Sequence, residues 1–116
     1  MNIKNILSSR ISHATCVQIL SSLGRMLQSG LSVHNALVML LDIYNTRSAE
    51  FRLVRHLIDN IQGGKSFADS LIAVNFGLTN WQFSLIRIGE ASNSMPIILE
   101  QIVDNFLYNN FGFSKI

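Results

Sequence analysis

The chain has 116 residues, the size of a single domain able to bury about 65% of the surface that its unfolded form exposes. Hydrophobic residues make up 48% of it and charged residues 14%, whereas an average domain carries about 25% charged residues. This composition predicts that some apolar surface contacts a partner or a membrane face. The formal charge of +2 is spread along the chain, which argues against a nucleic-acid partner.

No stretch of the sequence approaches the roughly 20 apolar residues that cross a bilayer. The N-terminal region also lacks the continuous apolar core of a signal peptide. The single cysteine, Cys16, cannot form an internal disulfide and stands among apolar residues, so we expect a packed thiol. These features together predict a cytoplasmic domain.

Residues 1–14 show no strong periodicity and are predicted to form an N-terminal arm. Its apolar residues fall roughly on one helical side, with two cations beside them: Ile3, Ile6, Leu7, Ile11, Lys4 and Arg10. A weak helix that binds a membrane surface or a partner is one interpretation of this pattern.

A helical period begins at about Thr15 and predicts a first helix that ends at Gly30. Ser32 is placed to cap a second helix, which runs to about Tyr44. The residues expected to face inward recur at helical spacing: Ile19, Leu20, Leu23, Met26 and Leu27 in the first helix, and Val33, Ala36, Leu37, Leu40 and Leu41 in the second.

Two more helices follow the turn at residues 45–48. In the third helix, the spacing predicts that Phe51, Val54, Ile58 and Ile61 face inward until Gly63 and Gly64 end it. Ser66 is predicted to cap a short fourth helix, with Asp69 completing a capping-box-like arrangement. Its inward side is expected to carry Phe67, Leu71 and Val74.

The last two predicted helices meet within residues 85–99. The fifth helix reaches Gly89, and the stripe expected to face inward consists of Trp81, Leu85 and Ile88. Ser92 and Asn93 belong to a polar turn, since asparagine tolerates the left-handed conformation that often ends a helix. Pro96 then opens a sixth helix, which extends toward Asn110. Residues 111–116 form an unassigned tail.

Glu90 stands where a negative charge is unfavourable. A carboxylate in the last turn of a helix faces the partial negative charge of that end, which costs about 0.3 to 1 kcal/mol. Arg87, three residues earlier, shares the helical face of Glu90 and is the expected compensating group. Backbone N–H groups of the following turn, a partner subunit or a hard cation are the alternatives.

No segment alternates apolar and polar residues as a half-buried strand does. The predicted fold is therefore all-α, a six-helix bundle of three antiparallel helical hairpins. The stretch that begins at Gly30 is echoed by the stretch that begins at Gly64, 34 residues later. We interpret the echo as a repeated corner, in which a residue that tolerates the left-handed conformation precedes a polar cap.

Three strings in the sequence resemble the signature stretches of the F-type domain of bacterial type II secretion and type IV pilus machines. They are MLQSGLSVHNALVML, IQGGKSFADSL and LIRIGEASNSMPIILEQIVDNF, within roughly residues 15–110. The residues that match the family pattern are Ser29 and Gly30, then Gly64, Ser66 and Leu71, then Gly89, Glu90, Ser92 and Pro96. Asn93 stands where the family usually has glycine, and Met95 where it has leucine.

The resemblance implies a non-catalytic domain of the inner-membrane platform protein. Such a domain would sit on the cytoplasmic face of the bacterial inner membrane and couple an assembly ATPase to pilin extrusion. The resemblance also implies a homo-oligomer, with a dimer as the simplest form. Since family members carry membrane helices after the domain, we expect this chain to be one part of a longer protein. The short arm resembles platform proteins of type IVb pili, such as the toxin-coregulated pilus.

Two other functions are weighed against a scaffold. A helix-turn-helix DNA-binding domain is disfavoured, since the candidate recognition helix, residues 32–44, has no Arg or Lys. A divalent-metal-regulated dimerisation module would use Glu90 with the i, i+4 pair Glu100 and Asp104, whose oxygen ligands suit calcium. No Walker-type loop, Cys/His metal pattern or nucleophile beside a base indicates an enzyme.

Overall fold

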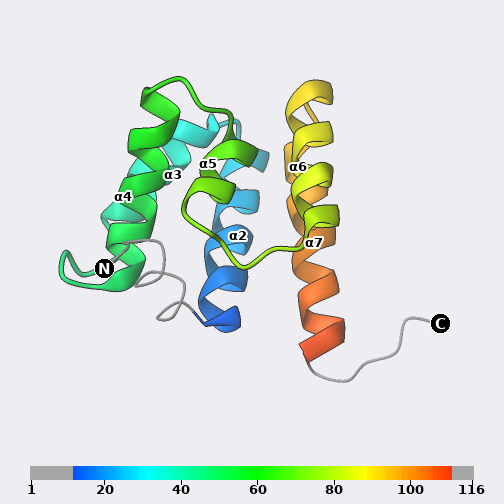
Figure 1. Cartoon of the computed structure of the whole chain (residues 1–116), viewed down its shortest axis with the longest axis horizontal. Coiled ribbons are helices and arrows are strands. Elements are labelled where there is room, and N and C mark those ends of the chain that lie inside the picture. The colour runs from blue at the N-terminus through cyan, green and yellow to red at the C-terminus, as the bar shows by residue number, and fades with distance from the viewer. Residues whose placement is uncertain (1–11, 111–116) are drawn as a thin grey trace.

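A computed structural model describes residues 12–110 of the chain. The helices alternate in direction along the sequence, so each runs antiparallel to the next (Figure 1). Among the described residues there is no strand, which confirms the predicted all-α fold. The helices are α2 (His13–Gln28), α3 (Val33–Leu41), α4 (Ala49–Gln62), α5 (Phe67–Ala73), α6 (Asn80–Ser92) and α7 (Met95–Asn110).

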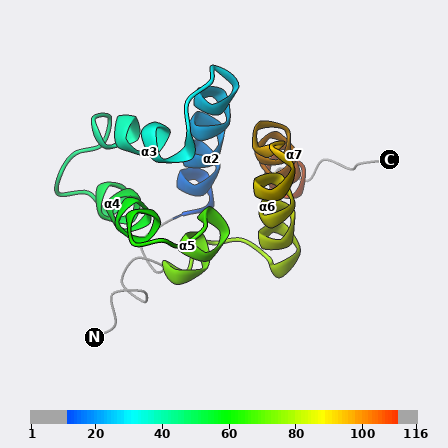
Figure 2. The ribbon, with the colours of Figure 1, turned by 90° about the horizontal axis from the view of Figure 1, so that it is seen from above.

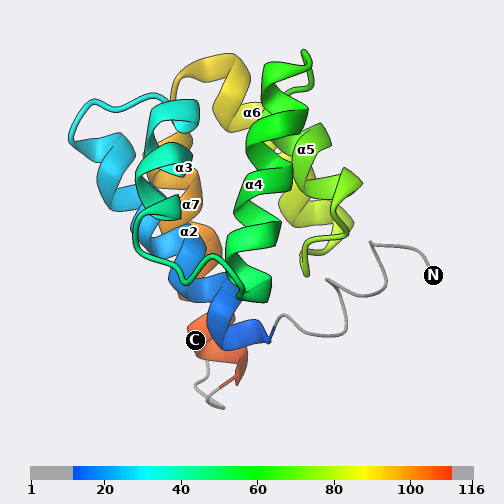
Figure 3. The same ribbon diagram turned by 90° about the vertical axis from the view of Figure 1, so that its left-hand side faces the viewer.

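The six helices form a closed ring around a single core (Figure 2). Each helix packs against its neighbours in sequence, and α7 closes the ring by packing extensively against α2. The predicted hairpins are the pairs α2–α3, α4–α5 and α6–α7. Figure 3 shows α3 and α4 side by side, with α5 on the other side of α4. No helix of residues 12–110 is both long and apolar enough to cross a bilayer.

Four helices end in the same way, with a left-handed residue just after the last turn. The backbone φ is +102° at Gly30 and +104° at Gly64, and it is +55° at Asn75 and +56° at Asn93. At Gly30, the N–H of the next residue, Leu31, donates to the carbonyl of Met26 over 3.3 Å, which satisfies a carbonyl that the helix leaves free. The predicted helix-ending roles of Gly30, Gly64 and Asn93 are confirmed.

Serine and threonine side chains cap the helix starts. The hydroxyls of Ser32 and Ser66 accept hydrogen bonds from the third residue of the helix that follows, at 3.1 Å and 3.0 Å. Both caps were predicted from the sequence, so the echo at an offset of 34 residues is a repeated corner. A full capping box stands at the start of α6, where Thr79 and Gln82 exchange hydrogen bonds.

The core consists mainly of the predicted apolar stripes. Ile19, Leu20 and Leu23 of α2 are buried, and so are Phe67, Leu71 and Val74 in and after α5. Cys16 is buried as well, which confirms the packed thiol, and burial raises the pKa of that thiol. In α4 the buried face is rotated from the predicted one. Phe51 and Ile61 are half-buried there, while the fully buried positions are Leu53, Val54, Leu57 and Ile58.

Three predicted helix ends need correction. The first helix begins at His13 rather than Thr15, because Ser12 accepts a hydrogen bond from the N–H of Thr15 and caps it. The second ends at Leu41 rather than near Tyr44, since its last turn tightens into bonds spanning three residues. The fifth does not stop at Gly89 but continues to Ser92. The rest of the predicted arm, residues 1–11, and the tail, residues 111–116, lie outside the described residues.

Candidate functional site

The three corners that carry the sequence motifs lie at one end of the bundle, which we call the corner end. Because the helices alternate in direction, the α2–α3, α4–α5 and α6–α7 connections all fall at this end (Figure 1). The connections at residues 42–48 and 74–79 lie at the opposite end. The corner end therefore gathers all the motif residues singled out in the sequence: Gly30, Ser32, Gly64, Ser66, Gly89, Glu90, Ser92, Asn93 and Pro96.

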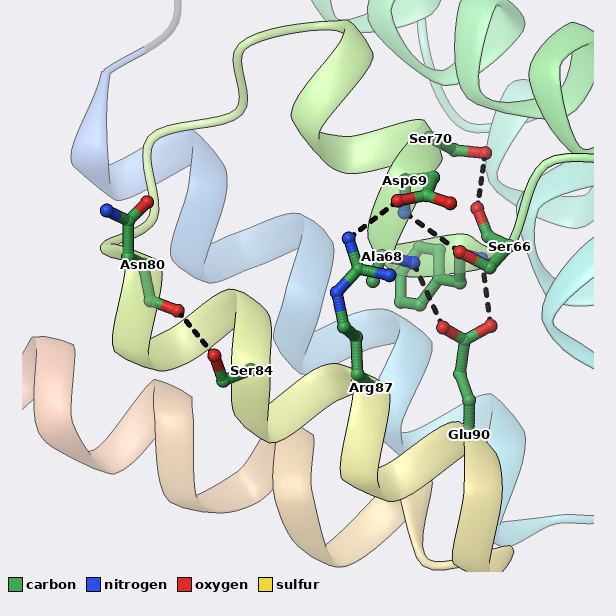
Figure 4. A network of polar contacts seen from close by, with 9 residues as sticks. Ser66, Ala68, Asp69, Ser70, Asn80, Ser84, Arg87 and Glu90 are labelled. Carbon is green, nitrogen blue, oxygen red and sulfur yellow. Dashed lines mark hydrogen bonds and ion pairs between the residues drawn. The ribbon is translucent and has the colours of Figure 1, made fainter.

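Glu90 links two of these corners. Its carboxylate accepts a hydrogen bond from the backbone N–H of Phe67 at Oε2, over 2.8 Å, and one from Ala68 at Oε1, over 3.2 Å (Figure 4). These N–H groups belong to the first turn of α5, which has no partners for them within the helix. Glu90 is thus a capping group for a helix 22 to 23 residues away in sequence. The partial positive charge of that helix start compensates its negative charge.

Arg87 does not pair with Glu90, so the expected compensation within one helix is wrong. Its guanidinium instead contacts the carboxylate of Asp69 on α5, with Nη2 and Oδ1 2.6 Å apart (Figure 4). This ion pair lowers the pKa of Asp69. Asp69 completes only half of the predicted capping box, because its N–H donates to Ser66 while its carboxylate is directed at Arg87. Glu90 and Arg87 together fasten α6 to the start of α5.

Gly89 lies where α6 packs tightly against α7. A Cβ atom on this residue would stand 3.2 Å from Cγ1 of Ile98 and 3.3 Å from the Cα of Met95. The residue is buried within α6, so its role is close packing and not the helix end that was predicted. The backbone carbonyl of Gly89 also accepts a hydrogen bond from the N–H of Ser94 at 3.1 Å, which fixes the corner.

A cleft of about 390 Å³ lies between the α2–α3 and α6–α7 corners. Its only ionisable lining residue is Glu90, whose carboxylate is already bonded to α5. Apolar and small polar residues make up the rest of the lining: Leu27, Leu31, Ser32, Val33, Gly89, Asn93, Met95 and Pro96. Residues from the first and third signature strings therefore line one cleft. Glu90, from the third string, also accepts hydrogen bonds from α5, whose residues belong to the second string.

The apolar stripe of α6 faces outward, which contradicts the predicted inward face. Trp81 is 67% exposed and Ile88 is 55% exposed, while Leu85 is half-buried. The buried face carries Gln82, Ile86 and Gly89 instead. Gln82 can be buried because its side-chain oxygen accepts the N–H of Thr79 at 2.9 Å. A prediction from hydrophobic periodicity places bulky apolar residues in the core. In α6, however, Gly89 and the hydrogen-bonded amide of Gln82 occupy buried positions.

The outward stripe continues across onto α7. A groove between the two helices is lined by Trp81 and Leu85 on one side and by Gln101 and Asn105 on the other. One turn beyond this groove toward the corner end stand Ile88 on α6 and Ile97 on α7, and Ile97 is 60% exposed. We call the surface formed by Leu85, Ile88, Ile97, Gln101 and Asn105 the neutral strip, because it contains no ionisable side chain.

The three carboxylates considered for a metal ion do not come together. Glu100 and Asp104 line a separate groove between α2 and α7, beside Arg25, whereas Glu90 is bonded to α5. Within residues 12–110, no group of three or more metal-ligating side chains is suited to hold an ion. Regulation by calcium stays a prediction. The negative charge of Glu90 is accounted for by its hydrogen bonds to the start of α5, without a metal ion.

Sequence reasoning missed two parts of this site. The capping box of α6 has a local signal, since Thr79 is followed three residues later by Gln82. The contact between Glu90 and the start of α5 has none, because its partners are backbone groups distant in sequence. Only the folded arrangement brings the second and third motifs together.

The described residues form a closed helical ring with an exposed face, the neutral strip, that carries no ionisable side chain. Residues 19–109 match the family described as type II secretion system (T2SS), protein F, and the chain belongs to that family. The family consists of inner-membrane platform components of secretion and pilus systems and is not known as catalytic. No curated protein matches the chain.

Proposed function

We propose that this domain works on the cytoplasmic face of the inner membrane as a docking platform. In this role it couples the assembly ATPase to pilin extrusion through protein–protein contacts, without catalysis of its own. Membership of the T2SS protein F family supports this role. The finer identification with a type IVb pilus rests on the resemblance of the sequence and forms part of the proposal.

The neutral strip is the observation that carries the proposal. Ile88 and Ile97 leave apolar surface open on this side of the domain, and exposed apolar side chains that lie together mark interaction sites. The strip occupies the outer side of α6 and α7, and the Glu90 and Arg87 contacts hold α6 firmly against α5. A partner helix could lie along the groove between α6 and α7 with its apolar side inward. The same surface is available for pairing with a second copy of the chain.

Charged substitutions on the neutral strip test the proposal. Ile88→Glu and Ile97→Glu each place a carboxylate where a partner would bury apolar surface, so we expect loss of pilus assembly or secretion and loss of co-purification with the assembly ATPase. The thermal midpoint should change little, because both side chains are more than half exposed.

Val38→Glu supplies the matched control. Val38 is an exposed apolar residue on α3, on the opposite side of the ring from the strip, and it is 41% exposed. This variant should assemble normally and bind the ATPase as the unmodified protein does. Normal assembly by both strip variants would refute the proposal, and so would equal losses in all three.

A divalent-metal-regulated dimerisation module is the second candidate function. Glu100 and Asp104 are exposed one turn apart on α7, so a second copy could contribute the oxygen ligands that one chain lacks. In this case calcium would raise the mass of the particle in solution, and a Glu100→Gln variant would abolish the response.

A further inference from the structure

The groove between α6 and α7, which we call the tryptophan groove, lies at the end of the neutral strip away from the corners. It has a volume of about 300 Å³. The buried Ile102 and the half-buried Leu85 contribute apolar surface to it. The full lining is Trp81, Gln82, Leu85, Gln101, Ile102 and Asn105. The groove therefore combines apolar surface with an aromatic ring and several side-chain amides.

Trp81 leaves most of its surface open to water beside this groove. It stands in the first turn of α6 and is 67% exposed. A ring of this size contributes strongly to a contact once it is buried, and its face stacks on other rings. Trp81 is thus placed as a stacking surface for a ligand that enters the groove.

The amides supply hydrogen-bond donors that the domain itself does not use. Gln82 is only 7% exposed, and its Oε1 atom accepts the N–H of Thr79, which leaves its NH2 group as a donor. No acceptor within residues 12–110 contacts that group, yet no fully buried side-chain nitrogen or oxygen atom of these residues lacks a partner. The NH2 group of Gln82 therefore opens into the groove that this residue lines. Gln101 adds an exposed amide from α7.

The lining of the tryptophan groove contains no ionisable side chain. Glu100 and Asp104, the acidic residues of α7, line the separate groove against α2. A charge on the ligand would lose its hydration here without gaining an opposite charge, which is costly. The complementary ligand is therefore uncharged, partly apolar and rich in hydrogen-bond acceptors.

We infer that the tryptophan groove binds a proline-containing segment of a partner protein in the extended polyproline II conformation. Such a segment has no internal hydrogen bonds, so its carbonyl groups accept from the amides of Gln82 and Gln101 while its proline rings pack on Trp81. An α-helix fits this groove less well, because its carbonyls are bonded within the helix and the amides would stay unpaired.

The inference rests on the proposed function for taking the neutral strip as a contact surface, and it names the chemistry of the segment at one end of that strip. A partner helix that covers Ile88 and Ile97 would end before the tryptophan groove, and the extended segment would continue from it.

Peptide titration of the full 116-residue chain tests the inference, with Trp81 as the reporter because it is the only tryptophan. The probe is nonaproline with acetylated and amidated ends, which is uncharged and adopts the polyproline II conformation. We expect a saturable change in Trp81 emission. A flexible peptide of glycine and serine and a helical peptide of alanine and glutamine should each bind at least about tenfold more weakly.

Variants separate the ring from the amides, with binding measured by the fluorescence anisotropy of labelled nonaproline. Trp81→Ala should weaken binding about tenfold. Gln101→Leu should weaken it about fivefold, because it removes a donor and keeps the bulk of the side chain. Gln18→Leu is the matched control, since Gln18 is an exposed glutamine of α2 that does not line the groove. This control should bind as tightly as the unmodified chain.

The inference is overturned by any of four results: no binding of nonaproline, tighter binding of the helical peptide, equal losses for Gln101→Leu and Gln18→Leu, or binding of an uncharged oligosaccharide such as maltoheptaose but not of nonaproline. The platform proposal fails on a different observation, normal assembly by Ile88→Glu and Ile97→Glu. Neither residue lines the tryptophan groove, so both variants should still bind nonaproline.

Discussion

Gly89 and Glu90 are neighbours in α6, yet they make contacts in different directions. Gly89 allows α7 to approach, and Glu90 reaches across to the first turn of α5. The sequence showed that this pair mattered but assigned both roles incorrectly. A glycine late in a helix is typical of a helix end, and a carboxylate three residues after an arginine is typical of a local ion pair. Both predictions rest on residues that are close in sequence, whereas the contacts of Gly89 with α7 and of Glu90 with α5 join different helices.

Gly89→Ala should destabilise the domain. The added Cβ would lie 3.3 Å from a backbone atom, the Cα of Met95, which cannot move aside at low cost. Overpacking costs about 1 to 3 kcal/mol, and the better helix propensity of alanine returns about 0.8 to 1 kcal/mol. We therefore expect denaturant unfolding to show a loss of about 1 kcal/mol.

Gly24→Ala is the control for that variant. Gly24 is also inside a helix, but its added Cβ would stand 3.7 Å from the Cβ of Leu99, an ordinary contact distance. This variant should be as stable as the unmodified protein or more stable. Equal gains for both alanine variants would show that α6 and α7 can separate slightly without penalty.

Glu90→Gln should lower the free energy of unfolding by about 1 kcal/mol, a typical loss for a helix cap. The amide keeps only one acceptor oxygen and no negative charge for the start of α5. Glu100→Gln removes the same charge from an exposed position on α7 and should change stability by less than about 0.5 kcal/mol. Thermal unfolding of the two variants gives the comparison, and equal midpoints would argue against the capping role of Glu90.

At the scale of elements, α5 is the shortest helix within residues 12–110 and depends on α6 for capping of its first turn. It has seven residues, too few for a stable isolated helix. Glu90 satisfies two of its N–H groups, and Arg87 contacts Asp69 on its outer side. These side chains hold a marginal helix in position without adding length to it.

The Asp69–Arg87 pair should make stability depend on pH. Because the pair lowers the pKa of Asp69 below its ordinary value of 3.8, its contribution is present above that value and is lost as pH falls through the lowered pKa. The thermal midpoint of Asp69→Asn should therefore lie below that of the unmodified protein at neutral pH. The gap should close in strong acid, and salt should narrow it, since the pair is half exposed. A gap that persists in strong acid would assign the effect to something other than charge.

The elements show which parts of the fold the sequence could predict. Helix starts and the turns between helices depend on residues that are close in sequence. The caps at Ser32 and Ser66 and the helix ends at Gly30 and Gly64 were therefore predicted correctly. The inward face of α6 was predicted wrongly. Burial there depends on what lies opposite each position, and a Cβ atom on Gly89 would stand only 3.2 Å from Cγ1 of Ile98. The neutral strip could not be predicted from the sequence for the same reason.

At the scale of the whole molecule, the domain has two different ends and one uncharged side. The motif residues gather at the corner end, the exposed aromatic residues Trp81 and Tyr108 lie toward the opposite end, and the neutral strip runs between them. The sequence could not show this arrangement, because it follows from the alternating helix directions and the closure of the ring.

The mass of the particle in solution tests self-association. We expect a dimer in sedimentation equilibrium, and we expect Ile88→Glu to convert it to a monomer by placing charge on the neutral strip. Added calcium should leave the mass unchanged, because no single chain gathers three suitable ligands within residues 12–110. A rise in mass with calcium would favour the metal-regulated module, and a monomer throughout would leave the strip to other partners.

Closure of the ring by α7 has a consequence for synthesis on the ribosome. The inner face of α2, with Leu20 and Leu23, is made first, but the helix that packs most extensively against it is made last. Until α7 has emerged, the nascent domain has an uncovered apolar side beside Gly24, where Leu99 will later pack. The domain therefore completes its fold only near the end of its own translation, and a chain arrested before α7 would be a target for chaperones and proteases.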